Sequence, residues 1–254
     1  MADENVLLSF QHISKEFPGV KALKDISFDV LRGEVHVLLG ENGAGKSTLV
    51  KIMTTLIGKD SGDLLIAGIN PEINPAKIQK MIGVASQDNE IDLSEQVGNL
   101  LVFQCRLFGL AKTEANRRAN ELIDLFRLTA ERDKKAGALS GGNKRRLHCA
   151  LALVHRPRIL FLDEPTVGMD PVARANFWEV ISTMNTEEGV TVFLTTQYLD
   201  EADKHATNMA LIAEGEIHYS GTIADFKKMV NPDGALSLDE SYLQYVKTLT
   251  TWQS

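Results

Sequence analysis

Cysteine is scarce in this sequence of 254 residues, which contains Cys105, Cys149 and no others. Two cysteines are too few for the disulfide framework that stabilises small secreted domains. The polar start of the chain has none of the apolar character of a secretory signal. We therefore expect a reducing, cytoplasmic compartment, with both cysteines as small buried side chains on helices.

Long apolar runs are also missing. No run approaches the ~18 to 20 apolar residues that a membrane-spanning helix needs. The sequence therefore argues against a chain that spans a membrane by itself, but it leaves room for a protein that works beside one. The six histidines lack the spacing of a metal site, and His36, inside an apolar run, is expected to be a hydrogen-bonded core residue.

Positive charge is in short supply. Lys and Arg number 27 against 34 Asp and Glu, a net charge of −7, so the chain has no overall attraction for nucleic acid or anionic lipid. The one basic turn, Lys144–Arg146, lacks interleaved aromatic residues, and we expect no nucleic-acid partner. Any phosphate that the protein binds must therefore be held by a local binding motif and not by overall positive charge.

What remains is the composition of an ordinary globular protein, with 44% hydrophobic and 24% charged residues. The length corresponds to about 1.7 average domains. Up to about residue 90, short apolar runs bounded by Gly, Pro and Asp are typical of strands, and they include Val6–Phe10, Ile26–Val30 and Leu64–Ala67. The run Val35–Leu39 is almost continuously apolar, which suits a strand buried on both faces of a parallel sheet.

Residues 95–155 carry apolar positions at helical spacing, such as Leu147 and Leu151, and no clear strand, which predicts a helical insert. Beyond it, strands alternate with helix-like segments, which indicates an α/β domain with a mostly parallel sheet. The tail, residues 231–254, is predicted to hold one helix over 238–249. The expected strands of this half are Ile159–Leu162, Val190–Leu194 and Met209–Ile212.

A phosphate-binding pattern, G-x-x-x-x-G-K-[ST], directly follows the buried run Val35–Leu39. Its glycines let successive N–H groups turn inward around a phosphate, and the N-terminus of the next helix adds its dipole. Lys46 is expected to reach the β- and γ-phosphates, and Ser47 to offer its hydroxyl to Mg²⁺. The loop consists of Gly40, Glu41, Asn42, Gly43, Ala44, Gly45, Lys46, Ser47 and Thr48. The apolar face expected on the following helix is Leu49, Val50, Ile52, Met53 and Leu56.

Two adjacent carboxylates, Asp163 and Glu164, follow the expected strand Ile159–Leu162. Ligands of open α/β sheets bind at this end of a strand. Neighbouring carboxylates repel each other unless a cation is close, so Asp163 is a candidate partner of Mg²⁺. Glu164 is the candidate base that polarises an attacking water. These residues predict hydrolysis of a nucleoside triphosphate.

A second anion-binding helix start is expected at Leu139–Leu147, where Ser140 is a good N-cap and two glycines free the backbone. By itself this segment would be a capped helix start with a solvated basic turn. Together with the phosphate loop, the carboxylates and Gly168–Asp170, its order and spacing closely resemble the nucleotide-binding domain of ATP-binding cassette (ABC) transporters. The resemblance covers almost the whole chain.

The resemblance implies a P-loop NTPase core with a mostly parallel sheet, an N-terminal antiparallel β subdomain and an inserted helical subdomain over 95–155. It implies that residues 1–254 form one nucleotide-binding domain, which binds ATP and Mg²⁺ and hydrolyses ATP. In that family, the Leu-Ser-Gly-Gly segment of one subunit contacts the γ-phosphate held by another, so that two sites close in a dimer. The residues implied for this contact in trans are Ser140, Gly141, Gly142 and Asn143.

Further site residues follow from the resemblance. Gln87 falls where the family has a glutamine that senses Mg²⁺ and the attacking water. Phe17 falls where an aromatic ring stacks on adenine, and its alternative is a core phenylalanine. The implied Mg²⁺ set is Ser47, Gln87 and Asp163, and the implied catalytic set is Glu164, Gln197 and Gln87.

Two positions depart from the family pattern. Asn143 replaces the usual glutamine with a shorter amide, which is a mild change. Gln197 stands where the family has a switch histidine. A glutamine can still donate a hydrogen bond to a γ-phosphate oxygen, but it cannot carry positive charge or relay a proton as imidazole does.

One branch of the family, the ATP-binding subunits of daunorubicin-type drug exporters, is favoured by several segments. They are Thr195–Leu199, residues 87–92, Pro165–Pro171 and residues 236–240. In contrast, Pro18–Leu23 and Glu41 are more similar to sugar-import ATPases, which generally carry two cassettes per chain. A non-transport ABC regulator is the third alternative.

The favoured resemblance implies a subunit on the cytoplasmic face of a membrane, where ATP-driven dimer closure powers export through separate transmembrane subunits. The partners are then those permease subunits and a second ATP-binding subunit, identical or different. Docking is expected beside Gln87, on the apolar surface of Leu100, Leu101, Phe103 and Leu107.

Overall fold

The structure is a computed structural model that describes residues 5–86, 91–233 and 235–251. The chain divides into two compact units. The first consists of Met1–Ile73 and Phe193–Ser254, and the second of Asn74–Val192. The phosphate loop lies in the first unit, whereas Asp163, Glu164 and the Leu-Ser-Gly-Gly segment lie in the second.

Strands and helices alternate along most of the chain. The strands are β1 (Val6–Phe17), β2 (Val20–Leu31), β3 (Val35–Leu39), β4 (Ser61–Ile66), β5 (Ile82–Ala85), β6 (Ile159–Asp163), β7 (Thr191–Thr195), β8 (Asn208–Ala213) and β9 (Glu216–Thr222). The α-helices are α1 (Lys46–Met53), α2 (Pro75–Gln79), α3 (Val97–Leu107), α4 (Lys112–Leu125), α5 (Gly141–Ala152), α6 (Pro171–Glu188), α7 (Leu199–His205), α8 (Ile223–Val230) and α9 (Leu238–Thr251). The 3₁₀ turns are η1 (Thr129–Glu131) and η2 (Ala136–Ala138).

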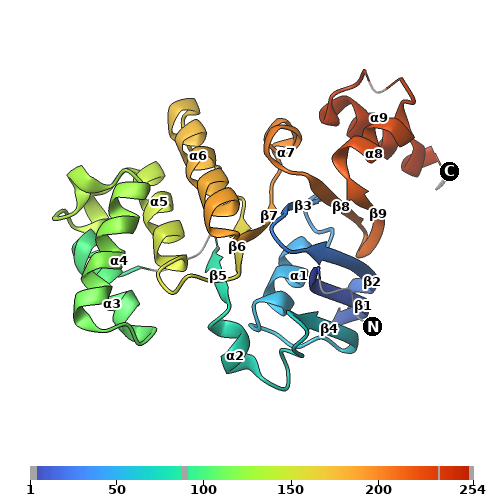
Figure 1. The fold of residues 1–254 in the computed structure, drawn as a ribbon. Coiled ribbons are helices and arrows are strands. Elements are labelled where there is room, and N and C mark those ends of the chain that lie inside the picture. The colour runs from blue at the N-terminus through green and yellow to red at the C-terminus, as the bar shows by residue number, and fades with distance from the viewer. Residues whose placement is uncertain (1–4, 87–90, 234, 252–254) are drawn as a thin grey trace. The chain divides into compact units, whose positions relative to one another are not determined.

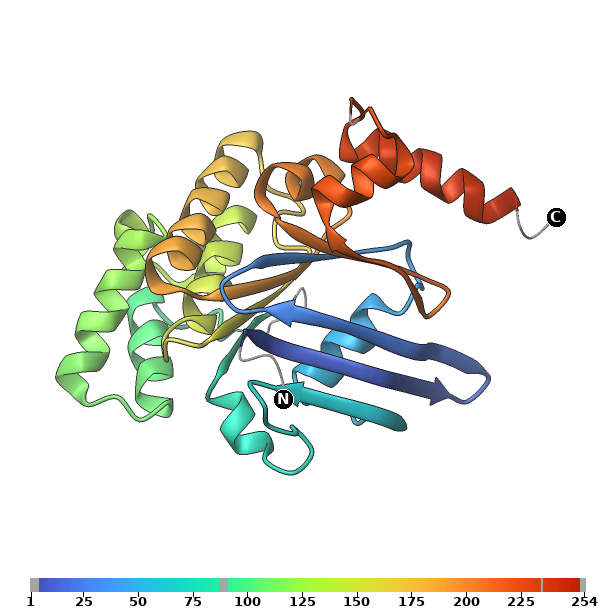
Figure 2. The same cartoon turned by 45° about the vertical axis from the view of Figure 1, so that its right-hand side comes forward.

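An antiparallel sheet in the order β2-β1-β4 forms one layer of the first unit. Figure 2 shows its three strands side by side as blue and teal arrows. Gly19, with φ +83°, lies in the turn between β1 and β2, where a residue with a Cβ would be strained. The rings of Phe10 and Phe28 occupy paired positions on β1 and β2 and stack with centroids 4.4 Å apart.

The second sheet of this unit is built on β3, all of whose residues are buried. β3 pairs in parallel with β8, and β9 adds an antiparallel strand beside β8. His36 of β3 is buried, its Nδ1 lies 2.9 Å from Oε1 of Glu34, and its ring stacks on Phe193 with centroids 5.4 Å apart. The expectation of a hydrogen-bonded core histidine is confirmed.

In the second unit, β5 and β6 pair in parallel, and the helices α3, α4 and α5 follow β5 in sequence (Figure 1). Arg118 of α4 is 3% exposed, and its Nη2 donates to the carbonyl of Leu153, 2.9 Å away. Its Nη1 lies 3.7 Å from a carboxylate oxygen of Glu188. This arginine therefore links α4 to the C-terminal ends of α5 and α6, inside the second unit.

Side-chain caps begin α5, α6 and α9, whereas α1 begins after Gly45 without a side-chain cap. The Ser140 hydroxyl accepts a hydrogen bond from the N–H of Asn143 at 3.3 Å and so begins α5, as expected. A carboxylate oxygen of Asp170 accepts from the N–H groups of Val172 and Ala173 at the start of α6. Ser237 and Glu240 form a reciprocal capping box that begins α9.

The predicted fold class is confirmed: the chain has an antiparallel β layer, a mostly parallel sheet and helices. β3 has the predicted bounds, and the predicted tail helix is α9, two residues longer. The prediction for Leu56 is wrong, because α1 ends at Met53 and the Leu56 side chain is exposed. β5 and β9 were not predicted, since β5 has four residues and β9 exposes every second residue without an apolar run. The boundaries 95–155 of a helical subdomain remain a prediction.

Both thiols are buried on helices, which confirms the prediction for the cysteines, and burial raises the pKa of the Cys149 thiol to about 12. Ellman's reagent at pH 8 should therefore react with neither cysteine in the folded protein, and with both after unfolding in guanidinium chloride. Because only the unfolded chain forms thiolate readily, the free energy of unfolding should also fall as the pH rises above about 9. A fast-reacting thiol in the folded protein would contradict this burial.

Candidate nucleotide-binding site

The phosphate loop leaves the buried strand β3 and enters α1 within a few residues. Gly43 and Gly45 have φ angles of +84° and +110°, so the loop turns through backbone conformations that residues with a Cβ rarely adopt. The Nζ of Lys46 donates to the carbonyl oxygens of Gly40 and Glu41, at 2.6 and 2.9 Å. The loop thus curls around an ammonium group at the N-terminus of a helix, which is a place that favours anions.

Close packing explains why two of the loop glycines cannot carry a side chain. A Cβ on Gly45 would lie 2.7 Å from the carbonyl oxygen of Ala22, near the start of β2. A Cβ on Gly40 would overlap the carbonyl oxygen of Ile212 on β8. The loop therefore lies directly against β2 and β8, and these strands hold its shape.

Ser47 and Thr48 belong to the first turn of α1, where backbone N–H groups have no partner within the helix. The Ser47 side chain is exposed and can reach a ligand. A hydroxyl oxygen can coordinate Mg²⁺, and an ammonium and the N–H groups of a helix N-terminus can donate hydrogen bonds to phosphate oxygens. The residues of this loop therefore fit such a ligand.

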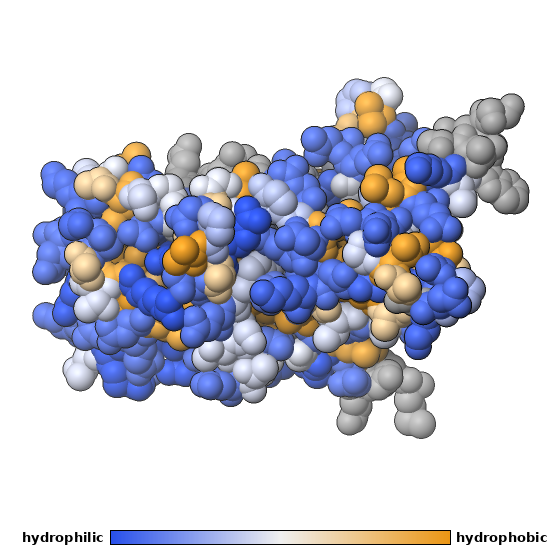
Figure 3. All heavy atoms as spheres, turned by 90° about the horizontal axis from the view of Figure 1, so that it is seen from above, coloured by the Kyte–Doolittle hydropathy of each residue, from blue (hydrophilic) through white to orange (hydrophobic). Residues whose placement is uncertain are grey.

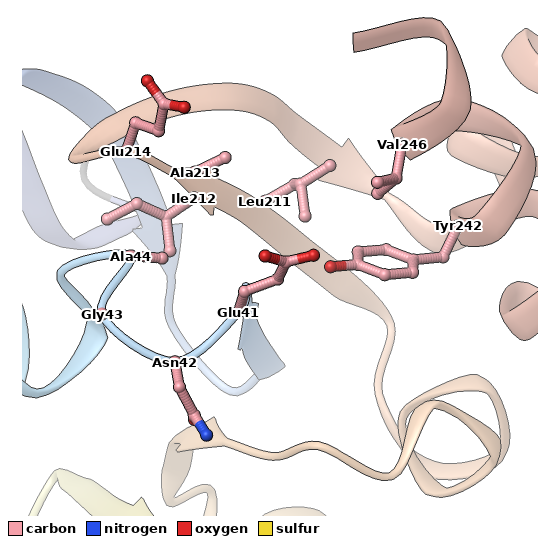
Figure 4. A pocket seen from close by; sticks show the side chains of 10 residues that line it. All are labelled: Glu41, Asn42, Gly43, Ala44, Leu211, Ile212, Ala213, Glu214, Tyr242 and Val246. Carbon is pink, nitrogen blue, oxygen red and sulfur yellow. The ribbon is translucent and has the colours of Figure 1, made fainter. Parts of the chain in front are cut away.

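A separate cavity of about 270 Å³ lies along the Glu41–Ala44 side of the loop, and its lining residues do not include Lys46, Ser47 or Thr48. In Figure 4 the Glu41 carboxylate points toward the phenol of Tyr242 on α9. Burial, with the charge of Glu41, raises the pKa of the Tyr242 phenol. The tail helix α9 thus contributes to the wall beside the phosphate loop.

Asp163 and Glu164 lie at the C-terminal end of β6, where the buried strand gives way to half-buried positions. Glu164 has φ +46°, a left-handed backbone that is uncommon for a residue other than glycine. The N–H of Val167 is hydrogen-bonded to the Glu164 carbonyl at 3.4 Å in the turn that follows. The unusual backbone is a feature that no sequence pattern indicated.

The N-terminus of α5 opens into a hollow of about 380 Å³. Its walls come from this helix start, from the segment around Gly168 and from the first turn of α6. The lining includes all four residues predicted for contact in trans: Ser140, Gly141, Gly142 and Asn143. The structure thus brings these residues together at one surface of the second unit.

The basic turn after them is only partly solvated. Arg145 is half-buried, and its guanidinium donates to main-chain carbonyls within the second unit. Sequence reasoning missed this residue because three basic residues in a row, Lys144–Arg146, give no indication of which one donates to main-chain carbonyls.

The remaining predicted site residues have different surroundings. Phe17, at the end of β1, is 40% exposed, which rules out the alternative of a fully buried core phenylalanine. The Nζ of Lys15 lies 5.6 Å from the centroid of this ring and forms an ion pair with Asp60. Gln197 is exposed and lies between β7 and α7. Gln87 lies outside the described residues.

Residues 23–167 match the family described as ABC transporter. The chain belongs to the ABC transporter family. One relative in this family is the doxorubicin resistance ATP-binding protein DrrA of Mycobacterium tuberculosis, 41% identical over 82% of this chain. The alignment covers 62% of that relative, so the chain spans less than two thirds of its length.

A second ABC relative is the linearmycin resistance ATP-binding protein LnrL of Bacillus subtilis, 33% identical over 96% of this chain and 79% of its own length. Among solved structures, the ATP-binding subunit of an ABC transporter is similar with a TM-score of 0.85 and 26% identity. That similarity covers 94% of this chain and 98% of the other. The ABC fold is therefore matched over nearly all of the sequence.

The surface seen in Figure 3 is mainly hydrophilic, with apolar side chains in separate patches. Within the described residues, no helix has both the length and the apolar character needed to cross a bilayer.

Lys46 supplies the decisive cation of the loop. Replacing it in Lys46→Met removes charge-assisted hydrogen bonds to a bound triphosphate, each worth about 1.5–3 kcal/mol. Affinity for Mg²⁺-ATP should therefore fall about 10- to 100-fold in calorimetric titration. Lys51→Met, which removes an exposed cation from the same helix, is the matched control and should leave affinity unchanged. Equal weakening by both variants would contradict a local role for Lys46.

Proposed function

We propose that this chain binds and hydrolyses ATP as the nucleotide-binding subunit of a membrane exporter. The observation that carries the proposal is the phosphate loop, in which Lys46 and the N-terminus of α1 converge on one place. The family membership supports ATP as the nucleotide, and the names of the relatives, which refer to resistance and ATP binding, support export.

The nucleotide would be held by groups with different tasks. The ring of Phe17 offers an exposed face for stacking on adenine. Residues 40–48 would hold the phosphates, with Lys46 exchanging its two loop carbonyls for phosphate oxygens. Mg²⁺, when bound, would neutralise phosphate charge, and the family resemblance assigns it to Ser47, Asp163 and Gln87. Because Ser47 and Asp163 belong to different units, that assignment rests on the sequence pattern.

Hydrolysis would need a base and a group that recognises the γ-phosphate. Glu164, at the end of β6, is the proposed base that takes a proton from the attacking water. Gln197 is the proposed donor to a γ-phosphate oxygen, since its amide carries two N–H bonds. It brings no positive charge, so we expect slower turnover than a histidine at this position would allow.

A second subunit would complete each site. The hollow at the start of α5 presents Ser140, Gly142 and Asn143 at a surface, together with the helix N-terminus. Such a surface suits the γ-phosphate of an ATP molecule held by another subunit. ATP would then be bound between two subunits, and its hydrolysis would release them.

The proposed transmembrane partner would dock on the second unit. A cavity of about 430 Å³ there is lined by side chains of α3 and of the segment before it: Asp92, Glu95, Asn99, Leu100 and Phe103. The prediction that Leu101 contributes to this surface is wrong, because its side chain is fully buried. Phe103 and Leu107 are exposed, as that prediction required. The subunit would thus work at the cytoplasmic face of a membrane.

The role of Glu164 can be measured directly. Glu164→Gln should lower the kcat of ATP hydrolysis by about 100-fold or more, since general base catalysis contributes about 10²- to 10⁴-fold. ATP binding should persist, and Mg²⁺-ATP should drive dimer formation in gel filtration. Glu187→Gln, on the exposed face of α6, is the control and should keep normal turnover. Near-normal kcat in Glu164→Gln would rule out Glu164 as the base.

The transport context can be tested by affinity purification from detergent-solubilised membranes of the native host. A multispanning protein should be recovered with the chain, and Phe103→Ser should reduce its recovery. Leu243→Ser, which alters an exposed leucine on α9, is the control and should have no effect. Recovery of soluble partners alone would favour a non-transport regulator, and recovery of an extracytoplasmic binding protein would favour an importer.

A further inference from the structure

Arg145 projects from the second turn of α5 onto the ends of two buried strands of its own unit. Its Nη1 donates to the carbonyl of Ser86, just after β5, at 2.6 Å. Its Nε donates to the carbonyl of Pro165 at 3.2 Å, and its Nη2 donates to the carbonyl of Asp163 at the end of β6. A weaker contact of 3.4 Å joins Nη2 to the carbonyl of Ala85.

Two of these carbonyls flank Glu164, the proposed base. Asp163 precedes it and Pro165 follows it, so the guanidinium holds the main chain on both sides of this single residue. Glu164 is also one of eight non-glycine residues among those described that have a positive φ, which is +46° here. A non-glycine residue keeps such a backbone only where the surrounding structure imposes it. The two hydrogen bonds of Arg145 are a contact that can impose it.

The chemistry of the contact requires arginine. All four hydrogen bonds go to main-chain carbonyls, which lie on two strand ends and in the following turn. A guanidinium presents five N–H donors in one rigid plane, so it can bridge separated acceptors at once. A lysine has its three donors on one nitrogen and cannot reach around Glu164 in the same way.

We propose that Arg145 is a positioning residue for hydrolysis, which holds the backbone of Glu164 in its left-handed conformation. The proposal rests on the proposed ATPase function and adds a residue that acts through Glu164. Arg145 lies on the same short helix whose N-terminus Ser140 caps. A ligand that contacts the start of α5 thus acts on a helix tied through Arg145 to the main chain around the base.

The test compares Arg145→Met and Arg145→Lys with Arg117→Met. Arg117 is an exposed arginine of α4 that pairs with Glu121 at 2.6 Å, so its loss removes a guanidinium from the same unit without touching β5 or β6. In Arg145→Met, kcat for ATP should fall about tenfold or more, with a change in KM below about twofold, because the phosphate loop lies in the other unit. Arg145→Lys should show a smaller loss of kcat, and Arg117→Met none.

Hydrogen exchange supplies a readout that does not depend on turnover. The N–H groups of Val167 and Met169 are hydrogen-bonded in the turns after Glu164, to the carbonyls of Glu164 and Thr166. Both amides should exchange about tenfold faster in Arg145→Met than in Arg117→Met, because the released segment opens more often. If Arg145→Met does not fold, the same two measurements on Arg145→Lys decide.

The outcomes separate this proposal from the proposed function. A parent protein that binds no ATP, or binds it without turnover, overturns the ATPase function, and the exchange rates then decide the role of Arg145 alone. A parent with normal turnover, together with Arg145 variants whose kcat and exchange rates match those of Arg117→Met, overturns the positioning role. Arg145 variants that combine a lower kcat with a similarly raised KM and a lower thermal stability would also overturn it, because these changes together indicate general unfolding.

Discussion

Carbonyl groups at the ends of buried strands need hydrogen-bond donors, and in each unit a basic side chain supplies them. After β3, the ammonium of Lys46 takes the carbonyls of Gly40 and Glu41. After β5 and β6, the guanidinium of Arg145 takes those of Ser86, Asp163 and Pro165. A buried strand that ended without such a donor would leave polar groups unsatisfied at considerable cost. Lys46 and Arg145 therefore satisfy main-chain carbonyls in the two loops that carry the proposed chemistry.

The two cations differ in how easily they can be displaced. Lys46 makes its bonds through one nitrogen at the end of a flexible chain, so its ammonium can exchange the two carbonyls for phosphate oxygens. Arg145 spreads its bonds over a rigid plane and two separate stretches of main chain, residues 85–86 and 163–165, so it acts as a fixed support. This division suits a site in which the nucleotide comes and goes while the base keeps its position. The close approach of Gly40 to Ile212 and of Gly45 to Ala22 keeps the loop itself equally fixed.

Much of the fold could be predicted from local patterns. β3 has its predicted bounds because a continuous apolar run followed by glycines is typical of a strand buried on both faces. Ser140 caps α5, as predicted, because its hydroxyl directly precedes a segment with helical spacing. The predictions failed where a residue's role depends on distant neighbours. β9 is a strand because it pairs with the edge of β8. Its residues alternate between exposed and half-buried positions and include no apolar run, so the sequence did not predict a strand there. Leu101 is buried while Phe103 is exposed on the same helix, which depends on what packs against α3.

The sequence by itself determined the family, the phosphate loop, the carboxylates after β6 and the Leu-Ser-Gly-Gly helix start. These are short segments whose chemistry requires certain residues at fixed spacing, so they can be identified without knowing the fold. Only the tertiary structure decided which of three consecutive basic residues donates to main-chain carbonyls, and that Glu164 has a left-handed backbone. Both depend on carbonyls at residues 86, 163 and 165, which come together when β5 and β6 pair in parallel. Because every residue has a carbonyl, no side-chain pattern in the sequence marks the ones that Arg145 binds.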